Sequence, residues 1–132
     1  MNRRQQRGAV LVEAAIGLLL FFTLVLGILD FSRAFNVYQT ISNAAREGAR
    51  YSVAPDPGTT TLPTVDQVVA HTQGFLDASS VAGSTIQVNQ TFAGAADLVY
   101  TDVTISVPYT SFLIGGTSFT ISADSRMRNE TN

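Results

Sequence analysis

A single glutamate, Glu13, stands near the start of an otherwise apolar run that extends from Ala9 to Leu29. An apolar stretch of about 20 residues crosses a hydrocarbon core of ~30 Å, so this run is long enough to be a membrane-spanning helix. A carboxylate about one turn inside the bilayer costs on the order of 2–3 kcal/mol unless it finds a partner. Glu13 therefore requires a counter-charge.

The residues just before Glu13 can supply one if the chain is cut. A peptidase that cleaves after Gly8 would leave Ala9 as the first residue, with a free ammonium group, and Glu13 as the fifth. An ammonium and a carboxylate one helical turn apart can pair within one helix or between neighbouring helices. The positive-inside rule keeps the basic leader in the cytoplasm and places the chain after Asp30 on the far side. The leader charges are Arg3, Arg4 and Arg7.

These features resemble the class III signal of type IV pilin-like proteins, which combines a basic leader, a glycine at the cut, a glutamate at the fifth mature position and an uninterrupted apolar helix. Residues Asn43 to Tyr51 resemble the juxtamembrane segment of TadE-like pseudopilins of the tight-adherence pilus system. The stretches Val103 to Tyr109 and Phe119 to Arg128 are similar to that family's C-terminal ending.

The resemblance implies a subunit that a prepilin peptidase processes and that takes part in assembly or initiation of an adherence pilus. Its implied partners are sibling pilins or pseudopilins, the pilus assembly platform with its ATPase, and membrane lipid. Residue 9 is Ala rather than the Phe or Met of many type IV pilins, and Ala14 replaces the Tyr that follows the glutamate in the major pilins of this system. Both departures favour a minor pseudopilin over the main filament protein.

Other interpretations of the N-terminus remain open. An unprocessed signal anchor would make the protein a membrane-tethered extracytoplasmic binding module, and it leaves Glu13 unexplained. A secretory signal peptide fits less well, because the apolar run exceeds the roughly 7–15 residues typical of that core and no A-x-A-like site follows Leu29.

The helix is expected to continue beyond the lipid, because no proline interrupts residues 30–51 and apolar residues recur at spacings of three and four. These residues are Phe31, Phe35, Tyr38, Ile41, Ala45 and Ala49. We expect one rod from about Ala9 to Tyr51, roughly 60 Å long at ~1.5 Å per residue. Asp30 and Arg33 are interpreted as markers of the boundary between lipid and water.

A patch of small side chains near the end of this rod would let another helix or a sheet approach closely. Its members are Ala44, Ala45, Gly48 and Ala49. The alternative is a solvated helix end with a weak surface pair between Glu47 and Arg50. The close-approach interpretation assigns the patch to packing between subunits or to docking of the head.

The rest of the chain predicts a small head. Ala54 to Gly58 is a proline-rich break, and a second helix is expected over Val65 to Ala78, with Thr64 and Gln67 forming a capping box. We expect the apolar face of this helix to pack on a sheet, with Val65, Val68, Val69, Thr72, Phe75 and Leu76 on that face.

Alternation of apolar and polar residues then predicts an antiparallel sheet that is solvated on one side. Its inward positions are Ile86, Val88, Val99, Val103, Ile105, Val107, Tyr109, Phe119, Ile121 and Ala123. Gly94 and the pair Gly115-Gly116 are expected in turns. The predicted fold is α+β, divided into a leader (1–8), a transmembrane helix (9–29), a stem (30–53) and an extracytoplasmic head (54–132). We expect a single pass through the cytoplasmic membrane with the N-terminus inside, or a place in the pilus at the cell surface.

Composition limits the other classes of function. The net charge is −2, and without the leader arginines the chain has five basic and ten acidic residues, which argues against nucleic acid. There is no cysteine, so the fold depends on packing without disulfides. His71 is the only histidine and has no G-x-S-x-G turn to complete a hydrolytic site with Asp66. The acids are scattered singly, so we expect no enzyme activity, metal or cofactor.

Overall fold

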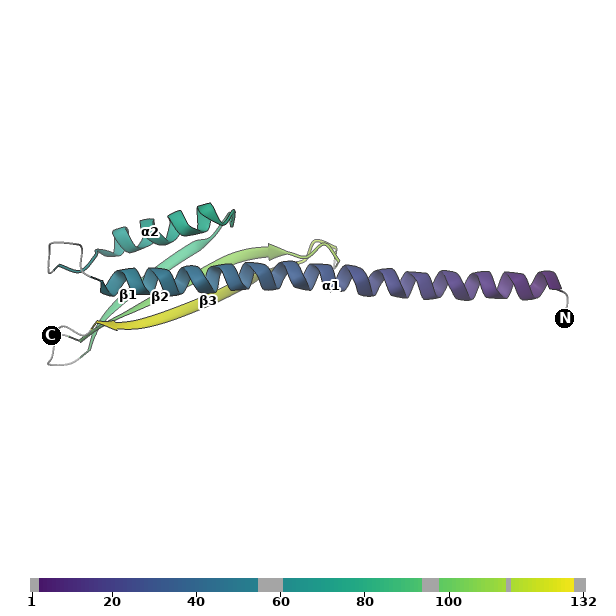
Figure 1. Ribbon diagram of the computed structural model, residues 1–132, viewed down its shortest axis with the longest axis horizontal. Coiled ribbons are helices and arrows are strands. Elements are labelled where there is room, and N and C mark those ends of the chain that lie inside the picture. Colours follow the sequence, from purple (N-terminus) through teal and green to yellow (C-terminus); the bar gives the residue numbers. More distant parts are fainter. Residues whose placement is uncertain (1–2, 55–60, 94–97, 114, 130–132) are drawn as a thin grey trace.

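The computed structural model describes the backbone of residues 3–54, 61–93, 98–113 and 115–129. A long helix α1 (Arg3–Val53) is followed by a short helix α2 (Val65–Ala78) and by the strands β1 (Thr85–Ala93), β2 (Leu98–Thr110) and β3 (Ser118–Asn129). The head packs along the C-terminal half of α1, and the N-terminal half extends alone (Figure 1). The predicted α+β, pilin-like layout is confirmed.

The helix α1 is one unbroken element of 51 residues. At ~1.5 Å per residue it is roughly 75 Å long, longer than expected because it begins at Arg3. It is long and apolar enough to cross a membrane, and the most apolar part of it has no residue buried inside the protein. Leu11 and Leu19, for example, are 70% and 67% exposed. An apolar surface of this extent requires lipid or other helices to cover it.

The head covers only part of the apolar face predicted on the upper half of α1. Ile41, Ala45 and Ala49 are buried as expected, but Phe31 and Phe35 are 72% and 50% exposed. Tyr38 is exposed as well. The covered face instead carries Asp30 and small or branched side chains, because only these let the sheet and α2 lie close to the helix axis. The three exposed aromatic residues form an aromatic ridge on the side that the head leaves open.

The small-residue patch lies where α1 meets the head. Ala44, Ala45 and Ala49 are fully buried in the core. A Cβ atom added to Gly48 would lie 2.3 Å from Oγ1 of Thr72 on α2, so the absence of a side chain permits the close approach of the two helices. Glycine at this helical position costs about 1 kcal/mol relative to alanine, which tertiary packing must offset.

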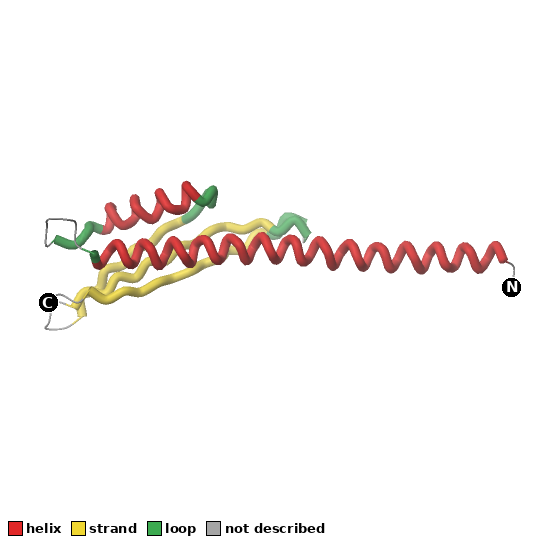
Figure 2. Tube along the Cα trace, in the orientation of Figure 1, coloured by secondary structure: helices red, strands yellow, loops and turns green. Residues whose placement is uncertain are grey.

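The sheet is a three-stranded antiparallel meander in the order β1-β2-β3. The strands run alongside the C-terminal half of α1, and α2 lies along the same half (Figure 2). The inward face of β2 is buried at Thr101, Val103, Ile105, Val107 and Tyr109, which confirms the predicted alternation. On β3, Ala123 is buried but Phe119 is 48% exposed, because it lies next to the β2–β3 turn rather than under α1.

The helix α2 begins with the predicted capping box. The Thr64 hydroxyl accepts a hydrogen bond from the backbone amide of Gln67 at 3.4 Å. The side-chain oxygen of Gln67 accepts one from the backbone amide of Thr64 at 2.8 Å. The helix packs against α1 and β1, which leaves Val65 and Phe75 exposed, contrary to the predicted face. Its buried residues are Val68, Thr72 and Leu76.

Two predicted turns have different outcomes. Gly115 and Gly116 have φ of +57° and +80° in the β2–β3 turn, as expected for glycine. Gly94 lies outside the described residues, as does the predicted break from residue 55 to residue 58.

The contact between Gly48 and Thr72 generates a stability prediction. We expect Gly48→Ala to lower the free energy of unfolding by about 1–2 kcal/mol, because overpacking outweighs the gain in helix propensity. The control is Gly74→Ala on α2, where an added Cβ meets no atom within 4 Å; it should be stabilising by about 0.5–1 kcal/mol. The measurement is denaturant unfolding of the full chain in detergent micelles, followed by circular dichroism.

The double variant Gly48→Ala/Thr72→Ala isolates the contact. In the Thr72→Ala background, which lacks the hydroxyl, Gly48→Ala should lower the free energy of unfolding by much less than it does in the wild type. Equal losses in both backgrounds would contradict the steric explanation.

Candidate functional site

The predicted cleavage site lies in an accessible part of α1. Gly8 and Ala9 are exposed helical residues, and a Cβ added to Gly8 would meet no neighbouring atom. Arg7 is exposed too. Arg3 and Arg4 belong to the helical backbone, but their side chains are not among those described. No contact with the head therefore obstructs the Gly8–Ala9 bond within the described residues.

Glu13 is exposed on the free half of α1. Among the side chains that the structure describes, none donates a hydrogen bond to it or forms an ion pair with it. Ala9 lies four residues earlier, about 6 Å along the axis and on the same face. An ammonium at Ala9 would thus be within reach of the carboxylate.

At the other end of the apolar run, Asp30 is buried under the end of β2 and is only 8% exposed. The Tyr109 hydroxyl donates to the carboxylate Oδ1 at 2.8 Å and to the Asp30 carbonyl at 2.9 Å. The Ser111 hydroxyl donates to Oδ2. We call these three residues the boundary clamp. It joins the helix to the end of β2 and to the residue that follows the strand, across 79 or more positions of sequence.

The sequence interpretation of Asp30 as a simple boundary marker was incomplete. The clamp was not predicted because no local sequence pattern around Tyr109 or Ser111 indicates a hydrogen-bond partner so distant in sequence. The one available signal is the position of Tyr109, at the end of the inward-facing alternation of β2, where a buried phenol requires a hydrogen-bond acceptor.

Hydrogen bonding and burial move the pKa values of Asp30 and Tyr109 apart in the boundary clamp. The bond from Ser111 lowers the pKa of Asp30 below its usual 3.8; burial opposes this, while Tyr109 and the backbone amides of Phe112 and Leu113 reinforce it. Burial raises the pKa of Tyr109 above its usual 10.0, and Asp30 raises it further against the effect of Arg33. At neutral pH an ionised carboxylate therefore accepts from a neutral phenol.

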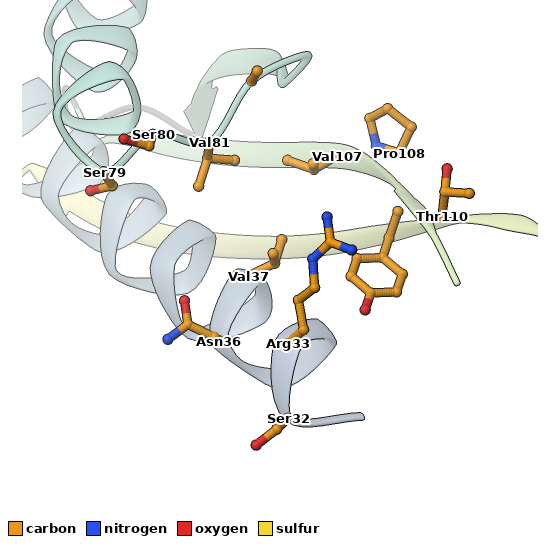
Figure 3. Close-up of a pocket in the computed structure, with 12 residues that line it drawn as sticks. Ser32, Arg33, Asn36, Val37, Ser79, Ser80, Val81, Val107, Pro108 and Thr110 are labelled. Atoms are coloured by element: carbon orange, nitrogen blue, oxygen red, sulfur yellow. The ribbon is translucent and has the colours of Figure 1, made fainter. Parts of the chain in front are cut away.

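A groove of about 720 Å³ lies beside the boundary clamp, between α1, the turn after α2 and the end of β2. Figure 3 shows Arg33 pointing from α1 toward the end of β2, with Ser79 and Ser80 on the opposite side. The Arg33 guanidinium carbon lies 5.5 Å from the centroid of the Tyr109 ring, within the range of a cation–π contact. The described residues that line this open groove include no arrangement of acid, base and nucleophile.

The upper end of α1 carries an exposed charged cluster. Arg50 donates to Glu47 at 3.0 and 2.7 Å, which is the predicted surface pair. The bond from Arg50 lowers the pKa of Glu47 below its usual 4.5. His71 is 3.6 Å from Glu47 and its ring stacks on Tyr51 with 4.3 Å between centroids. The described residues contain no group of three potential metal ligands.

Comparison with known protein families identifies the N-terminal segment. Residues 8–50 match the family model described as TadE-like protein. The match is about a third of the chain and includes Gly8, Glu13 and Asp30. No curated protein and no solved structure matches the chain. The predicted resemblance to TadE-like proteins is confirmed over these residues, and the resemblance of the C-terminal strands stays a prediction.

The boundary clamp generates a pH prediction. Because the pKa of Asp30 is lower in the folded than in the unfolded chain, its contribution to stability is present above about pH 3.8 and is lost as the pH falls through the folded value. We expect Asp30→Asn to reduce stability at neutral pH and to flatten the acid decline. Thermal unfolding between pH 7 and about pH 2 measures both effects.

Asp102→Asn is the matched control. Asp102 accepts from Arg126 at 2.5 and 2.9 Å on the exposed face of the sheet, and that bond lowers its pKa as well. Because the Asp102–Arg126 pair is solvated, Asp102→Asn should lower the free energy of unfolding at neutral pH by less than Asp30→Asn does. If Asp30→Asn matched the wild-type curve at every pH, the boundary clamp would have no energetic role.

Proposed function

We propose that this chain, whose residues 8–50 are TadE-like, is a minor pilin-like subunit that assists assembly or initiation of a tight-adherence pilus after its leader is removed. The supporting observation is an unbroken helix that matches the family model over residues 8–50. Its most apolar part is not buried by the head, and it carries Glu13, with which no described side chain pairs. The proposed location is the cytoplasmic membrane, with the head outside.

Leader removal would change the electrostatics of the helix end. The uncut chain has arginines at the cytoplasmic surface, and these resist movement of the helix along the membrane normal. Cleavage after Gly8 removes three positive charges and creates one ammonium on Ala9. A prepilin peptidase is the partner that the family resemblance implies for this step.

Glu13 would then acquire its counter-charge. A carboxylate in lipid is costly until it is paired, and the Ala9 ammonium of the same or a neighbouring chain lies at the right helical spacing. Pairing between chains would stabilise the helix within a bundle of like helices. Sibling pilins, together with the assembly platform and its ATPase, are the partners proposed for that step.

The open side of the stem supports lateral association. The aromatic ridge of Phe31, Phe35 and Tyr38 continues the apolar surface of the lower helix, and the first two rings stack with centroids 6.3 Å apart. Farther along α1 the head covers this face, because Ala45 and Ala49 are buried. A neighbouring helix could therefore pack along α1 as far as Tyr38 without displacing the head.

The mature N-terminus is the first prediction of this proposal. Mass spectrometry of the protein recovered from membranes should find a chain that begins at Ala9. The control Gly8→Val should retain the leader, because the small residue at the cut is lost. A wild-type chain that keeps Met1 or Asn2 in assembled material would instead favour the membrane-tethered binding module.

The second prediction concerns the charge of Glu13. Glu13→Gln keeps the size of the side chain and should insert into the membrane normally, but it should reduce the number of pili roughly tenfold or more, since about 1.4 kcal/mol of lost pairing changes an equilibrium tenfold. Glu47→Gln, on the same helix but in water, is the matched control and should leave piliation unchanged. Unchanged piliation in Glu13→Gln would count against the pairing role.

A further inference from the structure

The turn between β2 and β3 is the part of the head that extends farthest along α1 toward the N-terminus (Figure 1). The side chain of Leu113 in this turn reaches the membrane-spanning run, because its Cδ2 lies 3.5 Å from the place of an added Cβ on Gly27. Gly27 precedes the end of that run at Leu29 by two residues, or about 3 Å along the axis. The turn is therefore level with the outer edge of the apolar helix.

The described side chains at this turn expose apolar surface instead of burying it. Phe112 is 49% exposed, Leu113 is 38% exposed, and Phe119 on the adjoining end of β3 is 48% exposed. The neighbouring surface of α1 is apolar as well, with Leu26 and Leu29 exposed. Exposed apolar side chains thus lie both on the turn and on the adjoining stretch of α1, where an isolated soluble head would be expected to present polar residues.

The charge pattern of the hairpin agrees with this surface. No charged residue occurs between Asp102 and Asp124, a stretch that contains the lower part of β2, the turn and the start of β3. The charged pair of the sheet, Asp102 and Arg126, lies toward the opposite end of the strands. Asp30, on the neighbouring part of α1, is held by hydrogen bonds from Tyr109 and Ser111.

The turn also satisfies much of its own backbone. The Ser111 amide donates to the Thr117 carbonyl at 3.0 Å, and the Gly116 amide donates to the Ser111 carbonyl at 3.1 Å. The amides of Phe112 and Leu113 interact with Asp30. Because unpaired backbone groups are costly in lipid, these bonds permit the turn to lie at the boundary between headgroups and acyl chains, though not in the hydrocarbon core.

We propose that the β2–β3 turn is a lipid-binding wedge. It places Phe112 and Leu113 beside α1 in the outer leaflet of the cytoplasmic membrane. The wedge gives the head a second attachment to the bilayer and fixes its height above the surface, with Arg33 of the next helical turn at headgroup level. The proposal rests on the membrane placement of α1 in the proposed function, and it adds the lipid contact of the head.

Tryptophan fluorescence tests the wedge, because the chain has no tryptophan of its own. Three variants of the full chain are reconstituted in phosphatidylcholine vesicles: Leu113→Trp in the turn, Leu19→Trp at the middle of the apolar run and Phe75→Trp on α2. The lipids carry bromine either near the headgroup end or near the end of the acyl chains. Phe112→Trp replaces Leu113→Trp if the latter does not fold by circular dichroism.

Leu113→Trp should be quenched several-fold more than Phe75→Trp, and more by shallow than by deep bromine, whereas Leu19→Trp should prefer deep bromine. If Leu19→Trp is quenched and the turn variant is no more quenched than Phe75→Trp, the wedge is overturned while the membrane placement stands. Failure of all three to be quenched overturns both. A turn tryptophan that is unquenched and shifts to the blue as the protein-to-lipid ratio rises would assign the surface to a second copy instead, and would overturn lipid binding.

Discussion

The hydrogen bonds between Asp30 and the end of β2 determine where the head sits on its helix. Without them, a sheet could slide along an apolar helix, because apolar contacts are not directional. Tyr109 and Ser111 each have a fixed place in the β2–β3 hairpin, so their bonds to one carboxylate fix both the height and the rotation of the sheet. The rest of the packing, including the contact of Gly48 with Thr72, then follows along the same face of α1.

This arrangement divides the surface of α1 by size of side chain rather than by polarity. The head occupies the face with alanine and glycine, where backbones approach closely, and leaves the bulky aromatic ridge open. A helix that packed its large residues under the head would hold the sheet farther away and would present small residues to its neighbours. The open ridge thus leaves the more extensive apolar surface for contacts outside the chain.

Local patterns in the sequence predicted the elements well. The capping box at Thr64 and Gln67, the alternation from Val103 to Tyr109 and the paired glycines of the β2–β3 turn each depend on neighbours within a few residues. The apolar face of the stem was predicted, but the sequence did not show that the head leaves Phe31 and its aromatic neighbours uncovered, because periodicity finds an apolar face without showing what covers it. The boundary clamp could not be predicted, since it depends on the three-dimensional register between β2 and α1.

The two acids near the ends of the apolar run have opposite environments, and the contrast bears on function. Asp30 is enclosed by donors from its own chain, which makes its charge a part of the fold. Glu13 lies on a part of α1 that the head does not reach, and no side chain in the described residues pairs with it. A carboxylate that the fold does not stabilise, in a segment that lipid would surround, must be stabilised by something created or met after folding. The new ammonium at residue 9 and the helices of other subunits are the two sources that the proposed function supplies.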